Sequence, residues 1–198
     1  MTAATVPSWS GYPDATLHLD LDDTEHQRRQ AAGLGVVTGH GFGGLDVLMA
    51  LPHGLPVPLA GLDDRQRAYV RRAPAGICTT ADGHVVRHAI RPCRVALATV
   101  RAKSASLAAM ESCGRFAPFC ARQVIITRPP TLRNPERLLE FGFYGIGVIL
   151  QHAGGELETL VEPRPWVPKR HTAAAWWFAE RAYGQFLDQQ ATAVREVA

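Results

Sequence analysis

The chain has 198 residues, of which 46% are hydrophobic and 20% are charged, and its formal net charge is +3. This length allows one large domain, or one domain with a small appendage, and a sizeable hydrophobic core. No stretch approaches the roughly 20 consecutive apolar residues of a membrane-spanning helix, and residues 1–11 lack the basic start and apolar run of a secretory signal. We therefore expect a soluble protein of the cytoplasm that does not associate with a membrane.

The first part of the chain is predicted to contain one short helix. Residues 1–21 carry scattered proline, glycine and serine, and we expect them to be partly irregular. Asp22 or Asp23 is predicted to cap a helix that runs through Gln30, because an aspartate side chain accepts hydrogen bonds from the free N–H groups of a first helical turn. The apolar run at 36–38 predicts a short strand.

A glycine-rich loop and a buried segment come next. The loop, residues 39–44, lacks the Lys-Ser/Thr pair and the spacing of a phosphate-binding loop, so we interpret it as a turn. Residues 45–51 are apolar enough to be buried. We expect residues 1–60 to form an N-terminal segment packed on a core domain of residues 61–198, or to belong with it to a single domain.

A basic helix followed by a hairpin is predicted in the middle of the chain. The helix is capped by Asp63 or Asp64 and runs through Arg72. The Asp-Gly pair that follows it predicts a tight hairpin turn, which pairs Thr79 with Val86. The same order of elements resembles winged-helix modules over fewer than 30 residues, without the two preceding helices of a helix-turn-helix.

The four cysteines contain no Cys-x-x-Cys pair, and in a reducing compartment we expect buried free thiols. Cys78, His84, His88 and Cys93 are the residue types of a zinc site. In the predicted hairpin, however, Cys78 lies on the face opposite both histidines, which are themselves about 13 Å apart along one strand. We therefore predict no metal site.

Charge is unevenly distributed along the sequence. Residues 65–137 contain 14 basic and 3 acidic residues, whereas the rest of the chain contains 7 basic and 15 acidic residues. A basic segment of this kind is typical of proteins that bind phosphate or another polyanion. The alternative is that it neutralises the acidic ends of the same chain, or reflects a coding bias, since arginine outnumbers lysine 19 to 2.

From residue 95 onward, strands and helices alternate. Strands are predicted at 95–103, 124–127 and 144–150. A helix capped by Ser104 is predicted between the first two strands. A second helix, starting at Asn134-Pro135, is predicted between the last two; its buried side is assigned to Leu138, Leu139 and Phe141.

An edge strand and a long helix complete the predicted elements. Residues 157–162 are expected to pair antiparallel with the preceding strand at a sheet edge. Thr172 is predicted to cap the terminal helix, whose stripe of Trp176, Ala179, Tyr183 and Leu187 is interpreted as core packing.

The order of elements from 95 to 150, with Arg101-Ala102-Lys103 at the end of its first strand, resembles the second half of the PD-(D/E)XK, or restriction-endonuclease-like, core. The resemblance implies an α/β (α+β) fold with a mixed central sheet flanked by helices. In that family, a strand Asp and the Glu of Glu-x-Lys bind one or two divalent cations, and the lysine orients or activates the attacking water. Lys103 matches the lysine, Arg101 occupies the position of the carboxylate, and Asp82 or Asp46 is the candidate for the upstream acid.

Three hypotheses follow. The first is a non-catalytic protein of this fold, without a cofactor, that binds DNA, RNA or another polyanion through a basic surface. Its residues are Arg65, Arg67, Arg71, Arg72, Arg87, Arg91, Arg94, Arg101 and Lys103. The second is an active magnesium-dependent nuclease with migrated acidic ligands such as Glu111, in which Lys103 and Asp82 are catalytic. The third is an interaction or scaffold protein that binds a partner through its C-terminal aromatic region, which includes Trp166, Trp176 and Trp177.

Overall fold

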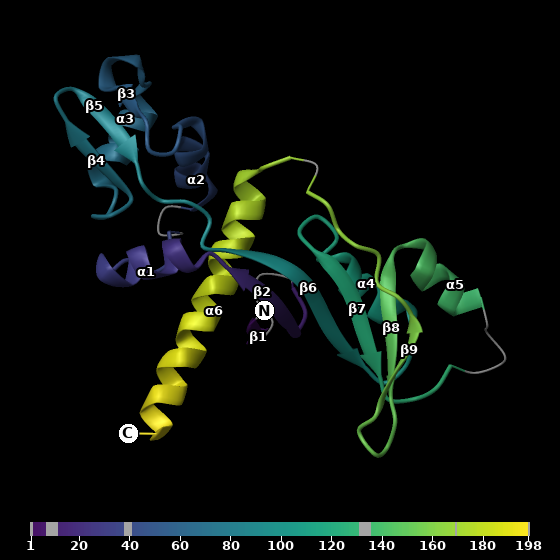
Figure 1. Ribbon diagram of the computed structural model, residues 1–198. Helices are drawn as coiled ribbons and strands as arrows, with labels where there is room; N and C mark the ends of the chain where they lie inside the picture. Colours follow the sequence, from purple (N-terminus) through teal and green to yellow (C-terminus); the bar gives the residue numbers. More distant parts are fainter. Residues whose placement is uncertain (1, 7–11, 38–40, 131–135, 169, 198) are drawn as a thin grey trace. The chain divides into compact units, whose positions relative to one another are not determined.

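The computed structural model describes residues 2–6, 12–37, 41–130, 136–168 and 170–197 (Figure 1). The chain forms two compact units, each built from separated stretches of sequence. The large-sheet unit comprises residues 1–20, 95–169 and 189–198, and the hairpin unit comprises residues 21–94 and 170–188. These interleaved units differ from the contiguous ranges 1–60 and 61–198 expected from the sequence.

The large-sheet unit is built on a mixed sheet of six strands in the order β1-β2-β6-β7-β8-β9. β6, β7 and β8 are parallel, while β1 pairs antiparallel with β2 and β9 with β8. The bounds are β1 Thr2–Val6, β2 Ala15–Leu21, β6 Cys93–Ala102, β7 Ala121–Ile126, β8 Ile146–Gln151 and β9 Leu157–Val161. The expected α/β class with a mixed sheet flanked by helices is confirmed, and so is the position of β9 at a sheet edge.

Two short helices connect the parallel strands. α4, Leu107–Gly114, joins β6 to β7, and α5, Glu136–Phe143, joins β7 to β8. The side chain that caps α4 belongs to Ser106, not to Ser104 as predicted, because the chain turns through Ser104 after β6 before it can enter the helix. The predicted cap of α5, Asn134-Pro135, lies outside the described residues.

The strands of the large sheet contribute buried side chains to this unit's core. Leu17 and Leu19 alternate along β2 with half-buried residues, whereas the parallel strands β6 and β7 bury consecutive residues, such as Thr99 with Val100 and Val124 to Ile126. The prediction of irregular structure for residues 1–21 was therefore wrong for β1 and β2. The sequence Thr-Leu-His-Leu-Asp-Leu in β2 does alternate with the period of a strand, and this was the missed signal.

The hairpin unit combines a three-stranded sheet, of order β3-β5-β4, with helices. Its elements are α1 Asp23–Ala31, α2 Gly41–Ala50, β3 Pro56–Pro58, the 3-10 turn η1 Leu59–Gly61, α3 Asp64–Arg72, β4 Cys78–Ala81, β5 His84–Arg87 and the first part of α6, Ala173–Val197. Asp22, Asp63 and Thr172 cap α1, α3 and α6 as predicted. The strand predicted at 36–38 is wrong for residues 36 and 37, and Thr38 lies outside the described residues.

The hairpin has the predicted register, in which Thr79 pairs with Val86. Its turn needs two left-handed residues, and Asp82 and Gly83 supply them with φ values of 49° and 74°. Residues 45–51 are largely buried, as expected, and residues 45–50 belong to the helix α2. On α6, burial of Trp176, Ala179 and Tyr183 confirms that the aromatic stripe is core packing.

Candidate anion-binding site

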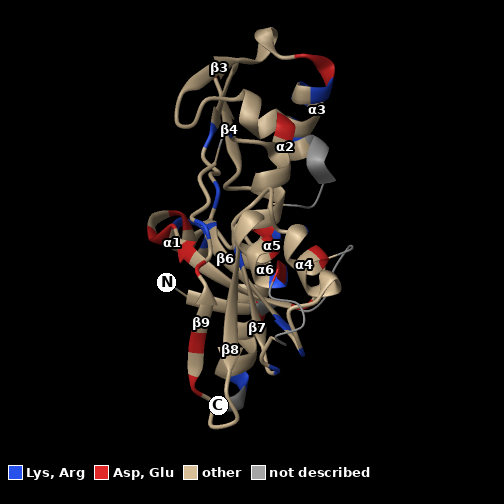
Figure 2. Ribbon diagram, turned by 90° about the vertical axis from the view of Figure 1, so that its right-hand side faces the viewer, with Lys and Arg blue, Asp and Glu red and all other residues tan. Residues whose placement is uncertain are grey.

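The nine basic residues singled out in the sequence are divided between the two units. Seven belong to the hairpin unit, whereas Arg101 and Lys103 belong to the large-sheet unit. The hairpin unit contains 11 basic and 9 acidic residues, and the large-sheet unit contains 10 and 9. The charge asymmetry of the sequence is therefore largely balanced within each unit, and acidic residues such as those on α1 and β9 contribute to this balance (Figure 2).

Helix α3 carries four of the seven basic residues of the hairpin unit. Arg67 pairs with Asp64 at 2.7 Å and also donates to the carbonyls of Leu59 and Leu62, so it supports the start of the helix. Arg65, Arg71 and Arg72 are exposed, and so is Arg94 at the start of β6. These exposed side chains can add charge to a surface.

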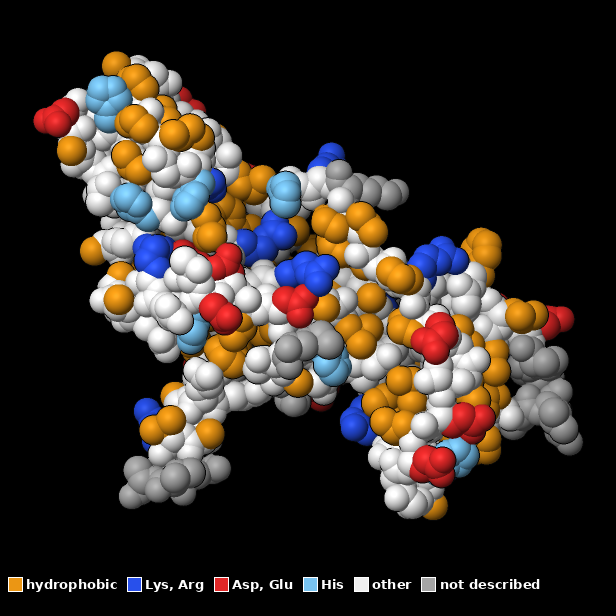
Figure 3. All heavy atoms as spheres, viewed as in Figure 1, with side chains coloured by type: hydrophobic (Ala, Val, Ile, Leu, Met, Phe, Trp, Pro, Cys, Tyr) orange, Lys and Arg blue, Asp and Glu red, His pale blue; other side chains and the backbone are white. Residues whose placement is uncertain are grey.

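Arg87 and Arg91 together line a pocket of the hairpin unit with a volume of about 420 Å³. The other lining residues are Met49, Ile90, His171 and Trp176. Figure 3 shows basic and histidine side chains beside a hollow with hydrophobic walls in this part of the surface. We call this cavity the arginine pocket.

Neither arginine of the pocket has an acidic partner among the described side chains. The Arg87 guanidinium lies 5.5 Å from the centre of the Trp176 ring, and its buried Nε has no hydrogen-bond acceptor. Burial lowers the pKa of Arg87, an effect that the nearby Cys78 thiol opposes. Burial likewise lowers the pKa of Arg91, and Cys93 opposes it. Both cations are thus partly desolvated and have no counterion in the described part of the chain, an arrangement that an incoming anion stabilises.

A buried ionic network holds Trp176 in place. The indole Nε1 donates to Glu180 Oε1 at 2.9 Å, and Glu180 is in turn bound by Arg29 through two hydrogen bonds of 2.7 and 2.8 Å. Arg29 also donates to Glu25 at 2.7 Å. This network determines where the indole lies, and the indole packs against the Arg87 guanidinium. Sequence reasoning missed it because the two ends, on α1 and α6, are 151 residues apart.

The residues matched to the nuclease pattern are divided between the two units. Lys103 is exposed just after β6, and exposed Arg101 donates to Gln151 Oε1 at 3.1 Å. Asp82 and Asp46 are exposed and belong to the hairpin unit, in the β4–β5 turn and on α2. Within the described ranges, no three His, Cys, Asp or Glu side chains form a group that would hold a metal ion.

A polar row crosses the sheet two residues before Arg101. Thr99 is 4% exposed, and its Oγ1 accepts a hydrogen bond from Gln123 Nε2 at 2.9 Å and lies 3.0 Å from His18 Nε2. Burial lowers the pKa of His18. The three uncharged side chains, on β2, β6 and β7, are joined by these hydrogen bonds. We interpret this row as a structural link between the strands.

The three tryptophans of the C-terminal aromatic region are each engaged within the chain. Trp176 is 4% exposed, the half-buried Trp166 donates to the Ala117 carbonyl at 3.1 Å, and Arg181 lies over the Trp177 ring at 5.9 Å. Partner binding at this region stays a prediction.

No described helix is both long enough and apolar enough to cross a membrane. Comparisons with protein-family models, with curated proteins and with solved structures find no match to this chain.

Proposed function

We propose that this protein binds nucleic acid through its phosphate groups, with the arginine pocket as the anchor, and does not cleave it. The observation that carries the proposal is the placement of Arg87 and Arg91 in one pocket without an acidic partner among the described residues. Most other buried charge in this unit is compensated, as the Arg29–Glu180 pair illustrates. A cation that is partly buried and left uncompensated is costly unless an anion completes the site.

The chemistry of the pocket suits a phosphate group. Guanidinium groups donate several hydrogen bonds in a planar fork, which matches phosphate oxygens. The apolar walls formed by Met49, Ile90 and Trp176 exclude water and strengthen these contacts. Arg71 and Arg72, exposed on α3 of the same unit, supply further charge that requires no particular base sequence.

The absence of cleavage in this proposal rests on the resemblance to the nuclease core. Arg101 stands where that family has the metal-binding carboxylate, and it hydrogen-bonds Gln151. At an effective dielectric constant near 20, a positive charge about 4 Å from a cation costs about 4 kcal/mol for each unit of cation charge. A magnesium ion is therefore disfavoured beside this strand end.

Fluorescence anisotropy tests the proposal. The full chain is titrated into labelled single-stranded DNA, duplex DNA and RNA of about 20 nucleotides at about 50 mM and about 200 mM salt. The variant R87A/R91A is expected to weaken binding about tenfold or more. It should also reduce the slope of log affinity against log salt concentration by about one to two, because fewer counterions are released on binding. Arg195→Ala removes an exposed arginine of the other unit and is expected to have little effect.

Two results would overturn the proposal. One is an absence of binding to all three nucleic acids at low salt. The other is equal weakening by R87A/R91A and by Arg195→Ala, which would mean that net charge rather than the pocket determines affinity. Heparin, a polyanion without bases, is titrated in parallel; if it alone binds through Arg87 and Arg91, the pocket recognises a different polyanion and the nucleic-acid proposal fails.

A further inference from the structure

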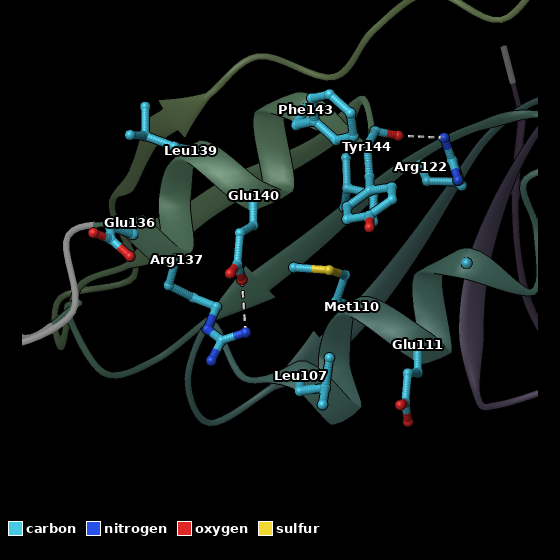
Figure 4. Close-up of a pocket in the computed structure, with 12 residues that line it drawn as sticks. Leu107, Met110, Glu111, Arg122, Glu136, Arg137, Leu139, Glu140, Phe143 and Tyr144 are labelled. Carbon is cyan, nitrogen blue, oxygen red and sulfur yellow. Dashed lines mark hydrogen bonds and ion pairs between the residues drawn. The ribbon is translucent and has the colours of Figure 1, made fainter.

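The large-sheet unit has a groove between α4 and α5, with a volume of about 690 Å³. Met110 on α4 and Tyr144 just after α5 point into the space between the helices (Figure 4). Arg122 on β7 and Ile146 on β8 also line it, so both helices border the groove on the same face of the sheet. We call it the α4–α5 groove.

Large hydrophobic side chains remain exposed around this groove. Leu139 and Phe143, four residues apart on α5, are 74% and 75% exposed, and Tyr144 and Leu107 are 56% and 55% exposed. The prediction that Leu139 belongs to the buried side of α5 is therefore wrong, whereas Phe141 is fully buried. α5 is thus apolar on two sides, one packed in the core and one open. A contiguous exposed group of this kind is typical of interaction surfaces.

Within the described ranges, two carboxylates at the groove have no basic partner. Arg137 is paired with Glu140 at 2.7 Å, and Arg122 donates to the Tyr144 carbonyl at 2.7 Å. No basic side chain in the described part of the chain pairs with Glu111 on α4 or Glu136 on α5. Figure 4 shows these two glutamates on opposite sides of the groove. The groove therefore combines an apolar surface with negative charge at its borders.

We propose that the α4–α5 groove binds an amphipathic helix of a partner protein, in which lysine or arginine residues flank the apolar stripe. A helix inserted in a groove presents anchors at positions i, i+3 or i+4, and i+7, and Leu107, Met110, Leu139 and Phe143 offer apolar contacts for them. Basic residues on either side of the stripe then meet Glu111 and Glu136. The inference is independent of the arginine pocket, since it concerns the other unit and a ligand of opposite charge.

Two synthetic peptides of about 16 residues test the inference. Both carry leucine at the helical anchor positions, and their remaining positions are mainly lysine in one and glutamate in the other. Each is labelled and titrated with the full chain in a fluorescence anisotropy assay. The lysine peptide is expected to bind with a micromolar dissociation constant, and the glutamate peptide about tenfold more weakly or not at all.

Variants locate the binding site. The double variant L139A/F143A is expected to weaken binding of the lysine peptide about tenfold, because it removes the central anchors. E111Q/E136Q is expected to weaken binding several-fold at low salt, and this difference should disappear at about 1 M salt. Leu157→Ala on β9 is the matched control, because Leu157 is 55% exposed, like Leu107, and does not line the groove. Thermal unfolding should be nearly unchanged in each variant, since the truncated side chains are exposed.

Several outcomes would overturn the inference. These are failure of the lysine peptide to bind, equal binding of the glutamate peptide, and equal weakening by Leu157→Ala. Light scattering on the full chain supplies one more: if the protein self-associates and L139A/F143A abolishes this, the occupant is a second copy and not a basic helix.

Discussion

Arg29 and Glu180 form a buried ion pair across 151 residues of sequence, with both side chains at 0% exposure. Arg29 also binds Glu25, and it donates to the carbonyls of Gly35 and Ile90. Glu180 further accepts hydrogen bonds from the Val37 backbone and the Trp176 indole. The pair thereby connects α1, the segment after it and α6 into one polar network inside the hairpin unit.

Removal of Glu180 is expected to destabilise the protein strongly. In Glu180→Ala, Arg28 and Arg29 share a single carboxylate, that of Glu25. Removing one partner of a buried ion pair lowers the free energy of unfolding by about 3–5 kcal/mol. Urea unfolding followed by tryptophan fluorescence measures the change in the free energy of unfolding. Glu156→Ala, at an exposed glutamate in the β8–β9 turn, is the control and is expected to change it by less than about 0.5 kcal/mol. A similar small loss for Glu180→Ala would show that the network contributes little.

The same network predicts a pH dependence of stability. Burial by itself would raise the pKa of Glu25, but its hydrogen bonds and ion pairs with Arg28 and Arg29 outweigh burial and lower the pKa below its usual 4.5. The unfolded chain therefore binds this proton more readily than the folded chain, so the contribution is present above pH 4.5 and lost as the pH falls through the folded-state pKa. The free energy of unfolding is expected to decrease with falling pH in this window, and less steeply in Glu25→Gln. Equal slopes for the two proteins would contradict the prediction.

Local features of this fold could be predicted from the sequence, because they depend on nearby residues. Asp22, Asp63 and Thr172 cap their helices through side-chain contacts within three residues, and the Asp82-Gly83 pair determines the hairpin register. The wrong cap of α4 arose because two serines, 104 and 106, both satisfy the local pattern, and the turn through Ser104 after β6 decides between them.

Features that depend on distant parts of the chain were not predictable in this way. Arg87 and Arg91 belonged to the predicted basic set, but their shared pocket requires Trp176, whose position depends on Glu180. Leu139 and Phe141 are two residues apart and therefore lie on different sides of α5. Only the packing of α5 on the sheet shows that the side with Phe141 is covered and the side with Leu139 is exposed. Periodicity identifies an apolar side chain, whereas tertiary contacts determine whether it is covered.

The cysteine thiols are expected to resist modification in the folded protein. Burial raises the pKa of Cys78 to about 11, and the pKa values of Cys113 and Cys120 to about 12, so the reactive thiolate is scarce near pH 8. All four cysteines are free, which agrees with the sequence prediction, although Cys78 is only partly buried. A disulfide reagent such as DTNB at about pH 8 should react slowly with the native protein and with four thiols after denaturation. Rapid reaction of a thiol in the native protein would contradict this prediction, because it would show that one cysteine is accessible to the reagent.

The purified protein is expected to leave DNA and RNA intact in the presence of magnesium or manganese. Catalysis of this type needs carboxylates that converge on the metal beside the lysine, and Arg101 replaces the carboxylate that the nuclease resemblance requires next to Lys103. Incubation of labelled duplex DNA and single-stranded RNA with each metal, followed by gel electrophoresis, measures cleavage. Metal-dependent cutting that is lost in both Lys103→Ala and Asp82→Ala would instead establish the nuclease hypothesis, because a contaminating enzyme would be unaffected by either substitution. Loss in Lys103→Ala alone would point to a different acid, with Glu111 the next residue to substitute.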